Sequence, residues 1–383
     1  PERYGDLQES RLDFNRAGIP LVEIVSEPDI QSATEAKAYC QELQLIFRYL
    51  GVSDADMEKG HMRCEANVSV QEDDHFVNEN GIIKPIKDHR LNNKVEVKNI
   101  NSFRFVEKAI KYEIARQKKM IEQGKLWPQE TRGWDSNKNE TVSQRIKETS
   151  ADYRYFPEPD IPPFSPLKIA AEIKLPELPQ AKRQRFAAEF GLSPSDAYLL
   201  TADKYWSDYA ENVMSELDDW VKNLPETKSR GETVIAELNL KNDLARLAGG
   251  WLTSKLMGLM AERKIDIKIL KLKPENFAEL IALIHAKRIN STNALKILNE
   301  MLDANTDKDP THIMEEKGYG QVSDENTISA MAEEIIKNYP QQVAQFKAGK
   351  EPIIKFLIGM VMKASEGSAD PVVVDKMLRE RLN

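Results

Sequence analysis

The stretch HMRCEANVSV, residues 61–70, decides the fold of the first part of the chain. Apolar side chains occupy its even positions, and polar or charged side chains occupy the odd positions between them. A period of two residues is typical of a β-strand with one buried and one exposed face. The stretch KVEVK, residues 94–98, repeats the pattern with its valines on one side. We therefore predict two strands whose polar faces carry Glu65 and Glu96.

Two long helices are predicted around these strands. Ser32 and Glu35 have the spacing of a capping box, and Gly51 follows the apolar stripe of the first helix. Ser102 can cap a second helix that Gly124 ends. Between the two strands, the polar residues 71–93 are predicted to form a hairpin excursion.

A third strand is predicted from the run IPLVEIV, residues 19–25, which is short, apolar and β-branched. Glu23 stands inside this run. Because a lone buried carboxylate is costly, we expect it to have a metal, a cation or a backbone end as partner.

The remaining chain is predicted to be helical. Closely spaced prolines indicate a linker at 166–180, after a first domain at 1–165. Apolar side chains then recur at helical spacing through a domain at 181–305 and a small tail at 306–383. Within the tail, residues 353–362 are apolar all round and predict a buried central helix. The fold class is α+β: a mixed or antiparallel sheet domain, then an all-α domain and a small all-α tail.

Composition excludes several classes of protein. The chain has 383 residues and a net charge of −8, and no apolar run approaches the roughly 18 residues that span a bilayer. Its two cysteines, Cys40 and Cys64, argue against a disulfide framework and for a reducing compartment. The opening at Pro1 shows no signal peptide, and we interpret the chain as a fragment that lacks its N-terminus. Within the tail, acidic residues outnumber basic ones up to 339 and basic residues outnumber acidic ones from 340 onward, which suits either a phosphate backbone or a solvated surface.

Carboxylates on strands are the remaining source of chemistry, because the chain has no P-loop, no G-x-G-x-x-G, no H-E-x-x-H and no G-x-S-x-G motif. If the strands pair, Glu23, Glu65 and Glu96 could converge with neighbouring cations on one surface. Such a surface suits Mg²⁺ and phosphate groups. The alternative is a set of solvated cross-strand pairs with no ligand.

Several longer strings resemble the B subunit of aspartyl/glutamyl-tRNA amidotransferases, the GatB family. They occur in the family's order and cover essentially the whole chain. The end of the chain also resembles the tRNA-associated YqeY-like helical module. The strings are DFNRAGIPLVEIVSEPDI (13–30), GVSDADMEKGHMRCEANVSV (51–70), KVEVKNINSF (94–103), QETRGWD (129–135), DYRYFPEPDIPPF (152–164), LPELPQAKRQRF (175–186), KRINSTNALKIL (287–298), EEKGYGQVSD (315–324) and FKAGKEPIIKFLIGMVMKA (346–364).

The resemblance implies a carbon–nitrogen ligase with glutamine as amido donor. The family uses ATP and Mg²⁺ to phosphorylate the side-chain carboxyl of Glu-tRNA(Gln) or Asp-tRNA(Asn). Ammonia channelled from a partner amidase, GatA, then displaces the phosphate, and a small third protein, GatC, completes the heterotrimer. A bacterial cytoplasmic protein is expected, with an organelle matrix as the other possibility. By this resemblance, the predicted sheet domain corresponds to the family's cradle domain.

The resemblance also assigns residues by motif. Glu23, Glu65 and Glu96 take the places of the Mg²⁺-binding catalytic carboxylates. The implied substrate or phosphate contacts are Arg63, Lys98, Asn99, Asn101 and Arg132, and the implied tRNA contacts are Lys347, Lys350 and Lys363. The family's first metal-binding segment precedes the point at which this chain begins.

Two other functions stay open at this stage. The chain could be a tRNA-binding module or a scaffold for the amidase, without catalysis of its own. A self-contained amidase is disfavoured, because no Ser-Ser-Lys type nucleophile motif is present.

Overall fold

The computed structural model describes residues 14–15, 17–79, 82–146, 157, 159–223, 234–303, 309–320, 325–365 and 369–382. By its internal contacts the chain divides into two units. Unit 1 comprises Pro1–Gln44 and Asp54–Phe164, and unit 2 comprises Leu45–Ser53 and Ser165–Asn383. Across the described residues, no helix is both long and apolar enough to cross a membrane.

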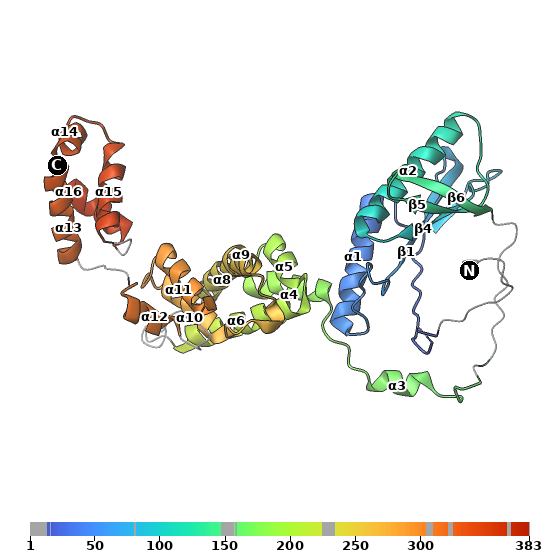
Figure 1. Ribbon diagram of the computed structural model, residues 1–383, viewed down its shortest axis with the longest axis horizontal. Coiled ribbons are helices and arrows are strands. Elements are labelled where there is room, and N and C mark those ends of the chain that lie inside the picture. The colour runs from blue at the N-terminus through green and yellow to red at the C-terminus, as the bar shows by residue number, and fades with distance from the viewer. Residues whose placement is uncertain are drawn as a thin grey trace, which may run out of the picture. The chain divides into compact units, whose positions relative to one another are not determined.

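Unit 1 is built on a mixed four-stranded sheet (Figure 1), as the sequence predicts. The order is β1-β4-β5-β6; β1 and β4 are antiparallel, β4 and β5 parallel, and β5 and β6 antiparallel. The separate hairpin of β2 and β3 lies in the predicted excursion, after a 3₁₀ turn at Asp73–His75. The strands are β1 (Cys64–Val68), β2 (Phe76–Glu79), β3 (Ile82–Pro85), β4 (Val95–Ile100), β5 (Glu130–Asp135) and β6 (Glu140–Ile146).

Two helices belong to the apolar side of this sheet, α1 (Ala33–Leu50) and α2 (Phe103–Glu122). Val95 and Val97 are fully buried in one cluster with Val106 of α2. The predicted alternation of faces is confirmed, since β1 also exposes Glu65 and buries the residues on either side more deeply. The polar side chains of β1 and β4 therefore lie on the face that α2 does not cover.

The predicted helix starts are confirmed. The backbone N–H of Glu35 donates to Ser32 Oγ at 3.1 Å, and Glu35 Oε2 accepts from the N–H of Gln31 at 2.8 Å. Ser102 accepts from the N–H of Phe105 at 3.2 Å, which fixes the entry of the chain from β4 into α2. These caps satisfy N–H groups that a helix start leaves without partners.

The predicted buried strand at residues 19–25 is wrong. The segment has no regular secondary structure, and its apolar side chains are exposed, Leu21 by 90%. A strand needs a backbone partner as well as apolar side chains. In the part of the chain that the structure describes, the sheet ends at β1 without adding this segment as a strand.

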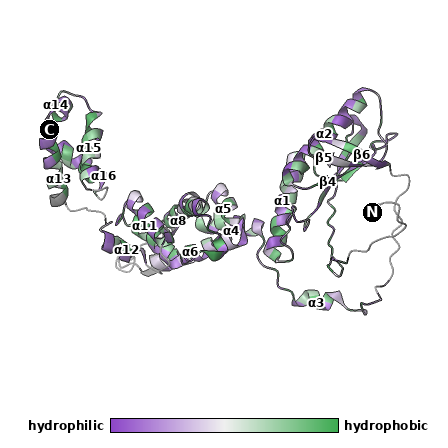
Figure 2. Ribbon diagram, viewed as in Figure 1, coloured by the Kyte–Doolittle hydropathy of each residue, from purple (hydrophilic) through white to green (hydrophobic). Residues whose placement is uncertain are grey.

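Unit 2 is helical, as predicted. The helices of its first core pack through their apolar side chains, and hydrophobic and hydrophilic residues alternate around them in Figure 2. A π-helical turn at Leu252–Leu256 joins α8 to α9. The helices around the first core are α4 (Pro179–Phe190), α5 (Pro194–Thr201), α6 (Lys204–Asn223), α8 (Val234–Trp251), α9 (Met257–Arg263), α10 (Pro274–His285), α11 (Ser291–Asp303) and α12 (Pro310–Lys317), and α3 (Pro166–Glu172), which precedes them, buries no side chain.

A second apolar core forms from the last four helices, α13 (Glu325–Asn338), α14 (Pro340–Lys347), α15 (Ile353–Ala364) and α16 (Pro371–Leu382). The prediction that residues 353–362 are buried all round is wrong in one respect. Leu357 and Val361 are buried, but Phe356 is 44% exposed, so α15 is amphipathic. An apolar sequence shows which residues can be buried, whereas the number of neighbouring helices decides how many are.

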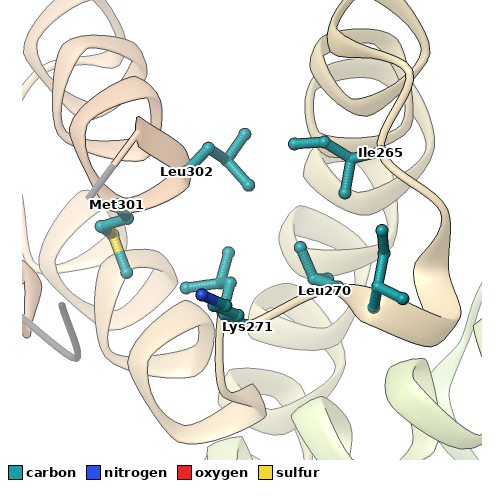
Figure 3. Close-up of a pocket in the computed structure, with 7 residues that line it drawn as sticks. Ile265, Leu270, Lys271, Met301 and Leu302 are labelled. Carbon is teal, nitrogen blue, oxygen red and sulfur yellow. The ribbon is translucent and has the colours of Figure 1, made fainter. Parts of the chain in front are cut away.

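An apolar pocket lies in unit 2 where the chain between α9 and α10 passes α11 (Figure 3). Its lining is almost entirely aliphatic, with Met301 and Leu302 on one side and Ile265 and Leu270 on the other. It holds no carboxylate, imidazole or thiol, so it offers no site for the chemistry that the sequence predicts.

Candidate functional site

Four side chains form a charged cluster on the open face of the unit 1 sheet. Lys98 Nζ donates to Glu65 Oε2 at 2.9 Å and to Glu65 Oε1 at 3.1 Å. The same ammonium lies 3.4 Å from Glu96 Oε1, and Thr131 Oγ1 donates to Glu96 Oε2 at 2.9 Å. We call Glu65, Glu96, Lys98 and Thr131 the open-face cluster.

Strand register places these residues together. Glu96 pairs with Asn67 of β1 and with Thr131 of β5, so its side chain and that of Thr131 share a face. The β1–β4 register is irregular between Cys64 and Ala66, where Glu65 lies opposite two residues of β4. Such a bulge changes the direction of nearby side chains.

Asn99 is the residue that makes this bulge possible. Its backbone has φ of +62°, a left-handed conformation that Asn tolerates better than most residues. Its side-chain amide Nδ2 donates to the carbonyl of Trp134 at 3.1 Å, which ties the bulge to β5. Left-handed residues of this kind recur near functional sites.

The charges of the open-face cluster do not cancel. Two carboxylates face one ammonium, and hydrogen bonding to Glu65 holds the pKa of Lys98 above its usual range. Lys98 is therefore a stable cation at neutral pH. The Glu96 side chain is 16% exposed and that of Glu65 43% exposed, so both carboxylates remain accessible from solvent.

The donor set fits Mg²⁺. This ion is commonly held by one or two carboxylates and completes its shell with water and substrate phosphates. Glu65 and Glu96 supply two hard oxygen ligands with one negative charge in excess of Lys98. Lys98 supplies the cation that a phosphate group needs in such a site.

Arg132 lies on the other face of the same sheet. It pairs in register with Val97, whose side chain is fully buried beneath α2. Its guanidinium donates to Glu130 Oε1 at 2.9 Å and to Thr141 Oγ1 at 2.8 Å, and its Nε lies 3.7 Å from Glu113 Oε2. Arg132 is thus separated from Glu96 by the thickness of the sheet.

Glu113 is the centre of this second group of charges. Its side chain is completely buried and accepts from Arg116 Nη2 at 2.6 Å, from Gln117 Nε2 at 2.8 Å and from Thr141 Oγ1 at 2.9 Å. We call Glu113, Arg116, Glu130 and Arg132 the buried-face network. Its charges balance, because two carboxylates meet two guanidinium groups.

The structure does not bring Glu23 into the open-face cluster. Glu23 is exposed on the irregular segment before α1. Among the described residues, the group of three side chains with metal-ligand spacing is Glu72, Asp74 and His75, next to the β2–β3 hairpin. A Mg²⁺ site with Glu23, Glu65 and Glu96 as its ligands stays a prediction. The structure brings two of these three residues together, Glu65 and Glu96.

The other residues assigned from the sequence are exposed. Arg63 directly precedes β1, and Asn101 directly follows β4, so both lie beside the strands of the cluster. Lys347 and Lys363 are in the last turns of α14 and α15, and Lys350 lies between these helices. The tRNA contacts of these three lysines stay predictions.

Sequence analysis missed Thr131. The string QETRGWD resembles a family motif, and its arginine is the residue whose charge points most directly to phosphate chemistry. The alternation of a strand provides the signal that could have found Thr131, because successive residues 131 and 132 must lie on opposite faces.

Two family models match the chain, the GatB/GatE catalytic domain over residues 3–172 and the GatB domain over residues 233–382. The B subunit of the aspartyl/glutamyl-tRNA(Asn/Gln) amidotransferase of Thermosynechococcus vestitus is 40% identical over 380 residues, which cover 98% of this chain and 67% of that protein. The chain belongs to the GatB family. The corresponding protein of Persephonella marina is also 40% identical, over 97% of this chain and 71% of its own length.

The open-face cluster lies inside the residues that match the GatB/GatE catalytic domain. The buried-face network lies there as well. The helices α13 to α16 lie within the match to the GatB domain. In this GatB chain, the match to the catalytic domain therefore covers both faces of the unit 1 sheet.

Proposed function

We propose that this chain is the GatB component of a tRNA-dependent amidotransferase and performs its activation step. It uses ATP to phosphorylate the side-chain carboxyl of Glu-tRNA(Gln) or Asp-tRNA(Asn). Ammonia from the amidase GatA then displaces the phosphate, with the small protein GatC in the complex. The enzyme is a carbon–nitrogen ligase with glutamine as amido donor, in the bacterial cytoplasm.

The observation that supports this proposal is the open-face cluster, with Lys98 held between Glu65 and Glu96 at distances of 2.9 and 3.4 Å. The reaction brings a substrate carboxylate toward the triphosphate, so two anions must be held together. A site for it needs both cations and metal ligands. The chain has no P-loop, and the cluster supplies both on one sheet face.

The charged residues of the cluster have two roles in this proposal. Lys98 binds a phosphate oxygen and stabilises the charge that develops on the transferred group. Glu65 and Glu96 would hold Mg²⁺, which supplies positive charge to offset the repulsion between carboxylate and phosphate. Asn99 and Asn101 follow Lys98 on the same stretch and are proposed substrate contacts, with Arg63 beside Glu65. Arg132 acts from beneath the sheet, by holding β5 in place.

The remaining assignments concern the metal and the tRNA. Glu23 is proposed as a further Mg²⁺ ligand on the segment before α1. Lys347, Lys350 and Lys363 are exposed cations near the ends of α14 and α15, and they are proposed to contact tRNA phosphates.

The test is transamidation by the complete complex, with Glu-tRNA(Gln), ATP and Mg²⁺, and with ammonium chloride as nitrogen source. Free ammonium bypasses the amidase, so a loss of rate belongs to the activation step. Glu96→Gln is expected to lower the rate by roughly 100-fold or more, because it weakens the site for the Mg²⁺ that would stabilise the developing charge. Binding of tRNA should stay unchanged.

The matched control is Glu79→Gln, which removes an exposed carboxylate of the same unit that pairs with Lys84 at 2.7 Å. It is expected to leave the rate unchanged. A Glu96→Gln complex as active as wild type would contradict the placement of the site and favour a tRNA-binding or scaffold role for this chain.

A further inference from the structure

We propose that Thr131 is a positioning residue, whose hydroxyl fixes the Glu96 carboxylate in the orientation that the activation step needs. This inference rests on the proposed function, and it adds an uncharged residue that is not itself proposed as a metal ligand. Of the two carboxylates in the open-face cluster, Glu96 is the one to which the Thr131 hydroxyl donates this hydrogen bond.

The geometry supports this role on three points. Thr131 Oγ1 donates to Glu96 Oε2 at 2.9 Å, and the two residues are direct register partners on parallel strands. Thr131 is only 2% exposed, so water does not compete freely for its hydroxyl. Glu96 Oε1, the other carboxylate oxygen, lies 3.4 Å from Lys98 Nζ. Each oxygen of Glu96 thus has its own partner, and rotation of the carboxylate would break both contacts.

Thr is well suited to this position. Its β-branched side chain has few rotamers on a strand, so the hydroxyl is held in one direction at low entropic cost. Its backbone is fixed in turn, because Arg132, the next residue, is bonded to Glu130 and Thr141 beneath the sheet. Hydrogen bonds to carboxylates that ligate metals tune their affinity, and loss of such a partner commonly costs 10- to 100-fold in metal affinity or activity.

The test compares three variants in the complete complex. Thr131→Val keeps the shape of the side chain and removes the hydroxyl, Thr131→Ala removes both, and Thr131→Ser keeps the hydroxyl. The readouts are the ammonium-dependent rate as a function of Mg²⁺ concentration and the direct binding of Mn²⁺ measured by electron paramagnetic resonance. Thermal unfolding of each variant shows whether the fold is retained.

Val and Ala are expected to lower the rate and to weaken Mn²⁺ binding by roughly 10- to 100-fold, and Ser is expected to restore both to near wild type. The Mg²⁺ concentration for half-maximal rate should rise in Val and Ala. A purely structural role would lower thermal stability without this shift and without rescue by Ser. If Val and Ala bind Mn²⁺ as wild type does, the proposal is wrong.

Glu96→Gln separates this proposal from the proposed function. If Glu96→Gln is inactive and Thr131→Val behaves as wild type, the activation site stands and the positioning role fails. If Glu96→Gln is fully active, both fail. Should Val not fold, the comparison of Ser with Ala still decides the role of the hydroxyl.

Discussion

The two faces of the unit 1 sheet carry the same kinds of side chain for different purposes. On the open face, Glu65 and Glu96 both contact Lys98 and are accessible to solvent. On the covered face, the buried-face network pairs two carboxylates with two guanidinium groups under α2. The comparison teaches that charge balance and burial, rather than residue type, distinguish the proposed binding site from the scaffold.

Burial decides which of the two groups holds the fold together. An uncompensated charge in a buried position is costly, so each member of a balanced buried network depends on the others. Exposed ion pairs contribute little, because water and salt screen them. The covered face should therefore control stability and the open face should control activity, and the following variants test that division.

The largest expected effect is on the covered face. Glu113→Ala removes the acceptor of Arg116, Gln117 and Thr141 and leaves buried donors without a partner. It should destabilise unit 1 by about 3–5 kcal/mol. Urea denaturation followed by hydrogen exchange of peptides over residues 95–146 measures the loss. The open-face variant Glu65→Gln should stay within about 1 kcal/mol of wild type, and equal losses in the two variants would contradict the comparison.

The next effect is on the open face and concerns activity. Lys98→Met removes the cation between Glu65 and Glu96 and keeps the apolar stem. The ammonium-dependent rate should fall roughly 100-fold, equivalent to about 2.7 kcal/mol of transition-state stabilisation. Its unfolding midpoint should stay near that of wild type. A variant that loses stability but retains its rate would assign Lys98 to the scaffold.

Much of this division could be predicted from the sequence, because alternation along strands is a local property. The pattern at 61–70 and 94–98 placed Glu65, Glu96 and Lys98 on one face, and the caps at Ser32 and Ser102 fixed two helix starts. Strand pairing depends on residues that are far apart in the sequence. The parallel pairing of β4 with β5 could therefore not be derived from the sequence of either strand alone.

Other features could not be predicted, because they depend on contacts between parts of the chain that are far apart in the sequence. The run at 19–25 has the composition of a buried strand, but a strand also needs a partner for its backbone. Arg132 was assigned to the site from the family motif, and only the register with Val97 shows that it lies on the covered face. Thr131 has no charge, and its importance follows from a hydrogen bond across two strands.

Asn99 provides a smaller test at the boundary of the two faces. Its φ of +62° is easily adopted by glycine and strained for alanine. Both substitutions remove the bond to the Trp134 carbonyl, so their difference isolates the backbone. Asn99→Ala should be less stable than Asn99→Gly by roughly 1–2 kcal/mol in urea denaturation. Equal stabilities would show that the bulge relaxes without cost and does not constrain Glu65.

The smallest effect should come from Glu107, a carboxylate of α2 that pairs with cations outside both groups. Hydrogen bonds from Lys111, and then from Lys37 of α1, lower its pKa from 4.5 to about 2. Because this pKa is lower in the folded state, the pair stabilises the fold above pH 4.5, and that contribution is lost as the pH falls from 4.5 toward 2. Glu107→Gln should therefore be less stable than wild type at neutral pH, with the difference shrinking across this window.

Urea midpoints measured from pH 7 to pH 2 check this, and the difference between wild type and Glu107→Gln should also shrink in high salt. Glu113 provides the matched contrast on the same helix, because its pairs are buried and poorly screened. The loss from Glu113→Ala should persist in high salt, whereas that from Glu107→Gln should not. If both losses respond equally to salt, water reaches the covered face, and the separation of site from scaffold by burial does not hold.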